Sequence, residues 1–329
     1  MKIPPLTAAV GRTTFGLLLA LCLTACAPRV TLQPETISTL PVAAHVADVP
    51  FFPQEQFQCG PASLAAMYQF TGLPIDPETL RPQIYLPGKQ GSLQAEIIAN
   101  VRRQQRLALP VQASLDGLLQ ELAAHRPVLV LQNLGFDWRP VWHYAVATGY
   151  DLSTQTITLN TGVTAQYAMD LAMFDRSWQR AKRWAIVVTR IGDIGATTPA
   201  QSYFQALAAL EKTTAPQTLL PGYLAGQQRW PQHFVFAFAA GNAYYQQQNW
   251  ADAARWYRLA LQAGDADQPV VLNNLADTLS QQGQYSQALH TLDQIQTTDP
   301  AMQQTLTQTR REILHAQALK DASPACAKP

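Results

Sequence analysis

The sequence has few charged residues and few cysteines. Asp, Glu, Lys and Arg make up 14% of the 329 residues, against roughly 25% in ordinary soluble proteins. The net charge is +1 and no basic run is present, so we expect no nucleic-acid partner. The four cysteines form no Cys-x-x-Cys pair and no His-Glu-x-x-His motif occurs, so the sequence predicts neither a metal site nor a cofactor.

The N-terminus has the order of a secretory signal peptide. Basic residues precede an apolar stretch over residues 15–23, which is too short for a lasting membrane helix. The stretch leads into Leu-Thr-Ala-Cys at Cys26, an order that resembles the bacterial lipobox. This resemblance implies removal of residues 1–25, acylation of Cys26 and, because Ala27 is not aspartate, an anchor in the outer membrane facing the periplasm. An ordinary signal peptide cut before an unmodified cysteine is the alternative.

Cys59 is the candidate nucleophile. The surrounding residues predict a short strand from Val49, a polar turn, and a helix that begins at Cys59 and ends before Gly72. Gly60 and Pro61 suit the first turn of such a helix. The positive end of the helix dipole favours the thiolate, so we expect a lowered thiol pKa. A small, buried core cysteine is the alternative interpretation.

Gln54 stands shortly before Cys59 and supplies a second polar group. Its amide and the backbone N–H of Cys59 could together form an oxyanion hole for acyl transfer. The order Pro-x-x-x-Gln, a short turn and Cys-Gly-Pro resembles the opening motif of the C39-like cysteine peptidases, a branch of the papain-like fold. This resemblance implies that the thiol hydrolyses peptide or amide bonds.

Residues 49–191 have the order of an α+β domain. Helical patterns fill most of residues 59–125, and antiparallel strands are predicted between residues 128 and 188, which is the order of papain-like enzymes. Turn-forming residues join the predicted strand at 141–150 to a partner at 156–160, so these two strands should form a hairpin.

His143 is the candidate base for the thiol. It alone lies in a strand of the same domain with an acid or amide behind it. The predicted hairpin places Asn160 opposite or diagonal to His143, so Asn160 is predicted to orient the imidazole in a Cys-His-Asn triad. In C39-like peptidases this third residue is usually Asp followed by Pro. Asp151, in the turn, is therefore left as a rival.

The C-terminal third is predicted to be helical. Residues 192–230 indicate a linker around one helix at 200–212, and the next two helical pairs repeat after about 35 residues, close to the period of about 34 in tetratricopeptide repeats, which they resemble. This implies a domain over residues 231–318 that recruits a protein partner. A flexible tail is predicted over 319–329. Small residues that would let the helices approach are Gly241, Ala253, Ala276 and Ala288.

Together these patterns predict a lipid-anchored thiol peptidase or amidase. A tether over residues 26–48 would connect the anchor to the peptidase-like domain, and a peptide or protein would be the substrate. Trp138 and Trp142 either wall a substrate groove or belong to the core. Two other functions stay open: a peptidase fold that serves only as a scaffold in an envelope assembly, and acyl or amide transfer by the same triad.

Overall fold

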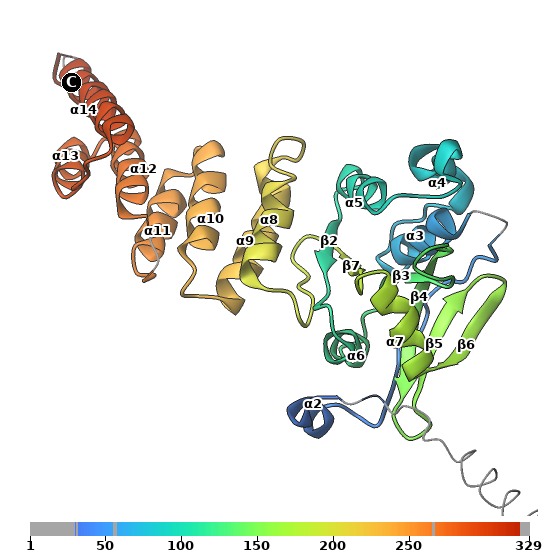
Figure 1. Ribbon diagram of the computed structural model, residues 1–329. Coiled ribbons are helices and arrows are strands. Elements are labelled where there is room, and N and C mark those ends of the chain that lie inside the picture. Colours follow the sequence, from blue (N-terminus) through green and yellow to red (C-terminus); the bar gives the residue numbers. More distant parts are fainter. Residues whose placement is uncertain (1–29, 31, 55–57, 265–266, 323–329) are drawn as a thin grey trace, which may run out of the picture.

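The computed structural model describes residue 30 and residues 32–54, 58–264 and 267–322. The predicted signal peptide and Cys26 lie outside the described residues. The chain forms a mixed helix and sheet domain from which a row of helices leads away (Figure 1). This confirms the predicted order of an α+β domain followed by an all-helical region.

A seven-stranded antiparallel sheet forms the centre of the first domain. Six strands follow the order β2-β7-β3-β4-β5-β6, and β1 pairs with the end of β4. The strands are β1 (Ala43–His45), β2 (Leu107–Pro110), β3 (Val128–Asn133), β4 (Trp142–Asp151), β5 (Thr156–Thr161), β6 (Thr164–Asp170) and β7 (Ala185–Thr189).

Helices cover both faces of this sheet, because its strands are apolar on both sides. Along β3, Leu129 and Leu131 point to one core, whereas Val128 and Val130 point to the other. The helix α3 (Cys59–Phe70) packs on the Leu129 face with α4 (Pro77–Ile84) and α5 (Gln94–Arg103) beside it. The opposite face carries α6 (Leu115–Ala123) and α7 (Leu171–Arg180). A short 3-10 turn, η1 (Pro87–Lys89), leads toward α5.

The segment predicted to be a tether over residues 26–48 is packed where the structure describes it. It forms α2 (Pro34–Thr39) and β1, and Leu32 and Val46 are buried in the apolar core shared with α6. The described residues of the predicted tether therefore belong to the folded domain. The packing was not predicted because the segment is rich in polar and proline residues, has only two buried apolar residues, and forms a strand of only three residues.

The row of helices begins earlier than predicted. Residues 192–230 hold two helices, not one, and both are packed into the same core as the sheet. The second was missed because it contains an internal proline and two glycines. Its Gly226 is required by packing, since a Cβ there would lie 2.3 Å from the ring of Phe236. The helices are α8 (Ala200–Ala208) and α9 (Pro216–Arg229).

The remaining helices pack in sequence order. They are α10 (Phe234–Gln246), α11 (Trp250–Ala260), α12 (Gln268–Gln281), α13 (Tyr285–Asp293) and α14 (Pro300–Ala322). The small residues predicted at helix contacts are buried. The last helix reaches Ala322, so the described start of the predicted tail, residues 319–322, is helical. Across the described segments, we find no helix with both the length and the apolar character needed to span a bilayer.

A buried carboxylate fixes the connection between the two regions. Glu121 of α6 accepts hydrogen bonds from the backbone N–H groups of Ala196 and Thr197, each at 2.8 Å, and from the Thr197 hydroxyl. One apolar core continues from the sheet through α8 and α9 to Phe236. The start of the helical row is thus a continuation of the domain's core, whereas α11–α14 pack in a separate apolar core.

Candidate active site

Cys59 is the first residue of α3 and lies at the wall of a cavity of ≈ 850 Å³. The side chain is half-buried and forms no disulfide. The next residue must be small, because a Cβ on Gly60 would lie 2.4 Å from the Ser92 hydroxyl. The predicted start of the helix at Cys59 is confirmed.

The electrostatic environment of the thiol differs from the prediction. Burial raises the pKa of Cys59, although hydrogen bonds from the backbone N–H groups of Tyr144, Gly60 and Cys59 itself act in the opposite direction. The expected lowering of the thiol pKa by the helix dipole is therefore wrong, because desolvation of the sulfur outweighs it. The resting group is a protonated thiol surrounded by N–H donors.

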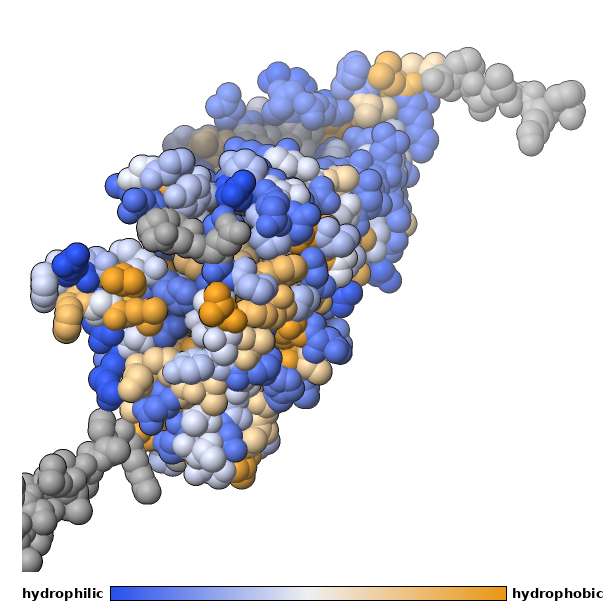
Figure 2. Space-filling model, turned by 90° about the vertical axis from the view of Figure 1, so that its right-hand side faces the viewer, coloured by the Kyte–Doolittle hydropathy of each residue, from blue (hydrophilic) through white to orange (hydrophobic). Residues whose placement is uncertain are grey.

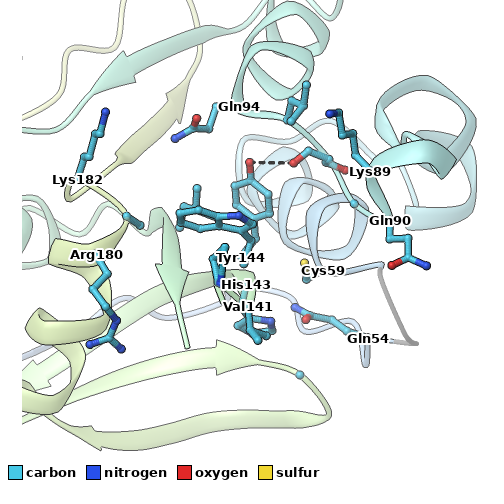
Figure 3. A pocket seen from close by; sticks show the side chains of 18 residues that line it. Gln54, Cys59, Lys89, Gln90, Gln94, Val141, His143, Tyr144, Arg180 and Lys182 are labelled. Carbon is cyan, nitrogen blue, oxygen red and sulfur yellow. Dashed lines mark hydrogen bonds between the residues drawn. The ribbon is translucent and has the colours of Figure 1, made fainter. Parts of the chain in front are cut away.

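Gln54 lies beside the same cavity. Its backbone N–H donates to the carbonyl of Gly162 at 2.9 Å, and its side-chain amide donates to the Ser63 hydroxyl at 3.4 Å. These two bonds hold the amide next to the first turns of α3, near Cys59 (Figure 3). The strand predicted from Val49 is absent over the described residues 49–54, which run as irregular chain.

His143 also lines the cavity, from the start of β4. Burial lowers the pKa of its imidazole. Its Nε2 atom forms a hydrogen bond of 2.7 Å with the Thr161 hydroxyl at the end of β5. Within the described residues no hydrogen bond connects the imidazole to Asn160 or to the thiol.

The predicted third member of the triad, Asn160, is placed elsewhere. It pairs with Val146 across the hairpin, and its buried Oδ1 accepts hydrogen bonds from the backbone and side chain of Gln166. Because side chains alternate along a strand, a residue opposite Val146 lies on the other face from His143. Asn160 therefore does not orient the imidazole. Thr161 makes the hydrogen bond to the imidazole that the sequence predicted for Asn160.

The rival, Asp151, is excluded by its own contacts. Its carboxylate accepts hydrogen bonds from the hydroxyl and backbone N–H of Ser153 at 2.6 and 2.8 Å, and these bonds lower its pKa. Asp151 pairs with Thr156, so the turn lies further along the chain than predicted. A β-bulge between Ala147 and Gly149 then shifts the register by one residue, so Asn160 lies opposite Val146 and not Ala147, and this shift is the physical reason for the error at Asn160.

The two tryptophans lie outside the core. Trp142 lines the cavity and is 54% exposed, and Trp138 is 79% exposed. The sequence did not indicate three basic residues of the cavity wall, because they are spread over a 3-10 turn, a helix end and a loop: Lys89, Arg180 and Lys182. Over the described part of the chain, no cluster of three His, Cys, Asp or Glu side chains could hold a metal ion.

Comparisons with known proteins give the class of this domain. Residues 46–186 match the model of the Peptidase_C39 like family. The chain is also similar to the crystal structure of a C39-like peptidase candidate from Bacillus anthracis, with 17% sequence identity, a TM-score of 0.38, and coverage of 45% of this chain and 98% of that chain. No curated protein matches the chain.

The family match spans the whole candidate site. Gln54, Cys59 and His143 all fall inside residues 46–186, and the row of helices from α8 onward falls outside them. The predicted C39-like domain is thus confirmed for the sheet half of the chain. The site brings together a thiol at a helix start, an imidazole and an amide donor, which are the groups that acyl transfer through a thioester requires.

Proposed function

We propose that the chain is a thiol peptidase or amidase. In this proposal the sulfur of Cys59 attacks a peptide carbonyl while His143 takes the thiol proton. The amide of Gln54 and the N–H of Cys59 stabilise the oxyanion. One observation carries the proposal: three groups from separate segments line one cavity, with the thiol at a helix start (Figure 3). The similarity to the C39-like peptidase family supports it.

The pKa shifts of Cys59 and His143 decide which of the two groups carries the proton before the reaction. The thiol pKa is raised and the imidazole pKa is lowered, so the resting pair is neutral. The proton therefore moves from sulfur to imidazole as the S–C bond forms. It then passes to the leaving amine as the C–N bond breaks, and water hydrolyses the thioester through the same base. Thr161 holds Nε2, which leaves Nδ1 for the transfer.

The test is hydrolysis of a complex peptide mixture by the purified chain. New N-termini are detected by amine labelling and mass spectrometry, in parallel for the native chain, Cys59→Ala and Cys326→Ser. We expect products from the native chain and from Cys326→Ser, which removes the other predicted thiol of the mature protein, and none from Cys59→Ala. An identical product list for all three proteins would contradict the proposal.

A non-catalytic scaffold is the second candidate, and two observations favour it. Neither a carboxylate nor a side-chain amide supports the His143 imidazole within the described residues, and the thiol pKa is raised. A scaffold has no need of a Cys59 that reacts faster than a model thiol. Alkylation of Cys59 at the rate of free cysteine, together with absence of new N-termini, would favour this function.

The anchor and the helical row complete the proposal. Acylation of Cys26 would place the protein at the outer membrane, facing the periplasm, and the repeats would recruit a protein partner. Metabolic labelling with a fatty-acid analogue tests the first point, since Cys26→Ser should abolish labelling and release the chain from the membrane fraction. Unchanged labelling in Cys26→Ser would contradict the anchor.

A further inference from the structure

An exposed aromatic hairpin stands beside the candidate site. This hairpin, residues 134–141, connects β3 to β4. Phe136 is 67% exposed and Trp138 is 79% exposed, and their rings stack with centroids 5.8 Å apart and planes 8° from parallel. Large apolar side chains that gather at a protein surface usually mark an interaction site.

The backbone of the hairpin is held firmly. The buried side chain of Asn133 accepts hydrogen bonds from the N–H groups of Gly135 and Val141, at 3.0 and 2.9 Å. Leu134 donates to the carbonyl of Val141 at 2.8 Å. Arg180 donates twice to the carbonyl of Asn133, at 2.8 and 3.1 Å. The aromatic rings are therefore presented by a fixed frame, and their exposure is built into the fold.

The hairpin is continuous with the cavity of Cys59. Pro140, Val141 and Trp142 line the cavity wall, and Phe136 and Trp138 continue the same loop outward. Apolar side chains are exposed on the end of the molecule that carries α3, β5 and β6 (Figure 2). An extended chain entering the cavity would thus pass over apolar surface.

The charge of the cavity has one sign. Among the described residues that line it, three are basic and none is acidic, although the whole chain is balanced at 23 basic and 22 acidic residues. Lys182 and Arg180 lie across the cavity from Cys59, and Lys89 lies on the Cys59 side (Figure 3). Lys89 and Lys182 are exposed and have no carboxylate partner in the described part of the chain.

Charges of one sign around a concave surface attract ligands of the opposite sign. The hairpin itself adds one charge of each sign, Asp137 and Arg139, so it leaves the positive field of the cavity in place.

We propose that the cavity binds an extended acidic polypeptide segment with a large apolar side chain. The apolar side chain would rest on the aromatic hairpin. The carboxylates would face Lys89 on one side of the scissile bond and Lys182 with Arg180 on the other. This inference rests on the proposed function, because it places the peptide carbonyl at Cys59. It names the substrate class that the site selects.

Binding is measured with full-length Cys59→Ala, which retains the cavity and lacks the thiol. Short fluorescein-labelled peptides share a Phe-Leu centre and differ only in flanks of Glu, Gln or Lys. Fluorescence anisotropy should show the Glu peptide binding about tenfold more tightly than the Gln peptide, and the Lys peptide more weakly still. Raising the salt from about 50 to about 200 mM should shrink this difference.

Matched variants assign the effect to residues. In the Cys59→Ala background, Lys182→Gln should weaken the Glu peptide by about 2–5-fold and spare the Gln peptide. Lys212→Gln, an exposed lysine outside the cavity, should change neither. Trp138→Ser should weaken all three peptides, whereas Leu314→Ser, an exposed apolar residue of α14, should not.

Several outcomes would overturn the inference. Equal binding of the Glu and Gln peptides, or indifference of the Glu peptide to Lys182→Gln, removes the charge selection. Loss of binding to phosphatidylglycerol vesicles in Trp138→Ser, with peptide binding unchanged, assigns the hairpin to a lipid surface instead. Hydrolysis by the native chain is scored separately. Binding without hydrolysis contradicts only the proposed function, and equal hydrolysis of all three peptides contradicts only this inference.

Discussion

The two faces of the sheet contribute to the candidate site in different ways. The α3 face supplies Cys59 through the start of a helix, where backbone N–H groups surround the sulfur. The α7 face supplies His143, which is held by the Thr161 hydroxyl at the end of β5. One group is positioned by backbone and the other by a side chain. The site therefore forms only where β5 ends and the two faces meet.

The two faces also differ in the extent of their cores. The core under α3 is confined to the sheet half, whereas the core under α6 and α7 runs on through α8 and α9 to Phe236. The imidazole side of the site thus belongs to the same packed unit as α8, α9 and the start of α10. The thiol side does not. Substitutions in the core of one face should therefore affect different parts of the chain from substitutions in the core of the other.

Loss of the imidazole should have the largest effect on activity. His143→Ala removes the proposed base, and we expect turnover to fall by about 10²–10⁴-fold, the usual contribution of general base catalysis. Stability should change little, because the side chain is only partly buried. Steady-state hydrolysis and thermal unfolding of the same preparation check both. Turnover within a factor of two of the native chain would remove His143 from the mechanism.

Truncation of the core on each face should separate the two units. Trp178 lies fully buried on the inner face of α7, stacks on Phe174 and donates to the Trp184 carbonyl at 2.9 Å. Trp178→Ala should cost about 3–5 kcal/mol, and Leu64→Ala, on the buried face of α3, about 2–5 kcal/mol. Hydrogen exchange should accelerate in α8–α10 only for Trp178→Ala, because only that core reaches them. Equal acceleration in both variants would contradict two separate cores.

Thr161 and Asn160 should have opposite effects. Thr161→Val removes the hydrogen bond to the imidazole, so kcat/KM should fall about 10–100-fold, as expected for a bond to a group that becomes charged. Thr161→Ser should restore most of it. Asn160→Ala leaves the Gln166 N–H unpaired, so it should lower stability by about 1–3 kcal/mol and leave kcat nearly unchanged. A loss of kcat/KM in Asn160→Ala, with Thr161→Val close to the native chain, would support the predicted Cys-His-Asn triad.

The pH dependence of stability should be the smallest effect. The pKa of His143 is lowered on folding, so the unfolded chain binds more protons as pH falls below about 6.5, and stability should decrease there. The pKa of Cys59 is raised, so stability should decrease above pH 9.0, where the unfolded thiol ionises and the folded one does not. Urea unfolding of the native chain, His143→Ala and Cys59→Ala measures these slopes, and each variant should lose one of them.

Much of the fold could be predicted because clear sequence signals mark the helices and strands. Asp170 caps α7 by accepting from the Met173 N–H, and apolar runs mark β3 and β7. Cys59 and Gln54 could be proposed from the sequence because local motifs carry them. The register of the hairpin could not be predicted, because the bulge between Ala147 and Gly149 shifts it by one residue, and a one-residue shift reverses every side chain beyond it.

The basic residues of the cavity wall and the packing of α9 could not be predicted from the sequence. Both depend on contacts between residues that are far apart along the chain. Lys89 ends the 3-10 turn η1 and Lys182 lies in a loop after α7, and only the folded chain brings the two together. The helix α9 carries Pro221 and Gly226, which weaken a helical pattern, and its packing against Phe236 overrides that weakness. No local signal in the sequence reports such contacts.

Alkylation of Cys59 across pH, with and without His143, tests the central claim most directly. Iodoacetamide should label the native thiol with a rate that rises as the imidazole loses its proton, at a midpoint below about 6.5. In His143→Ala that component should vanish, leaving a single rise above pH 9.0, as the raised thiol pKa requires. Superimposable profiles for the two proteins would show that the thiol and the imidazole do not act together.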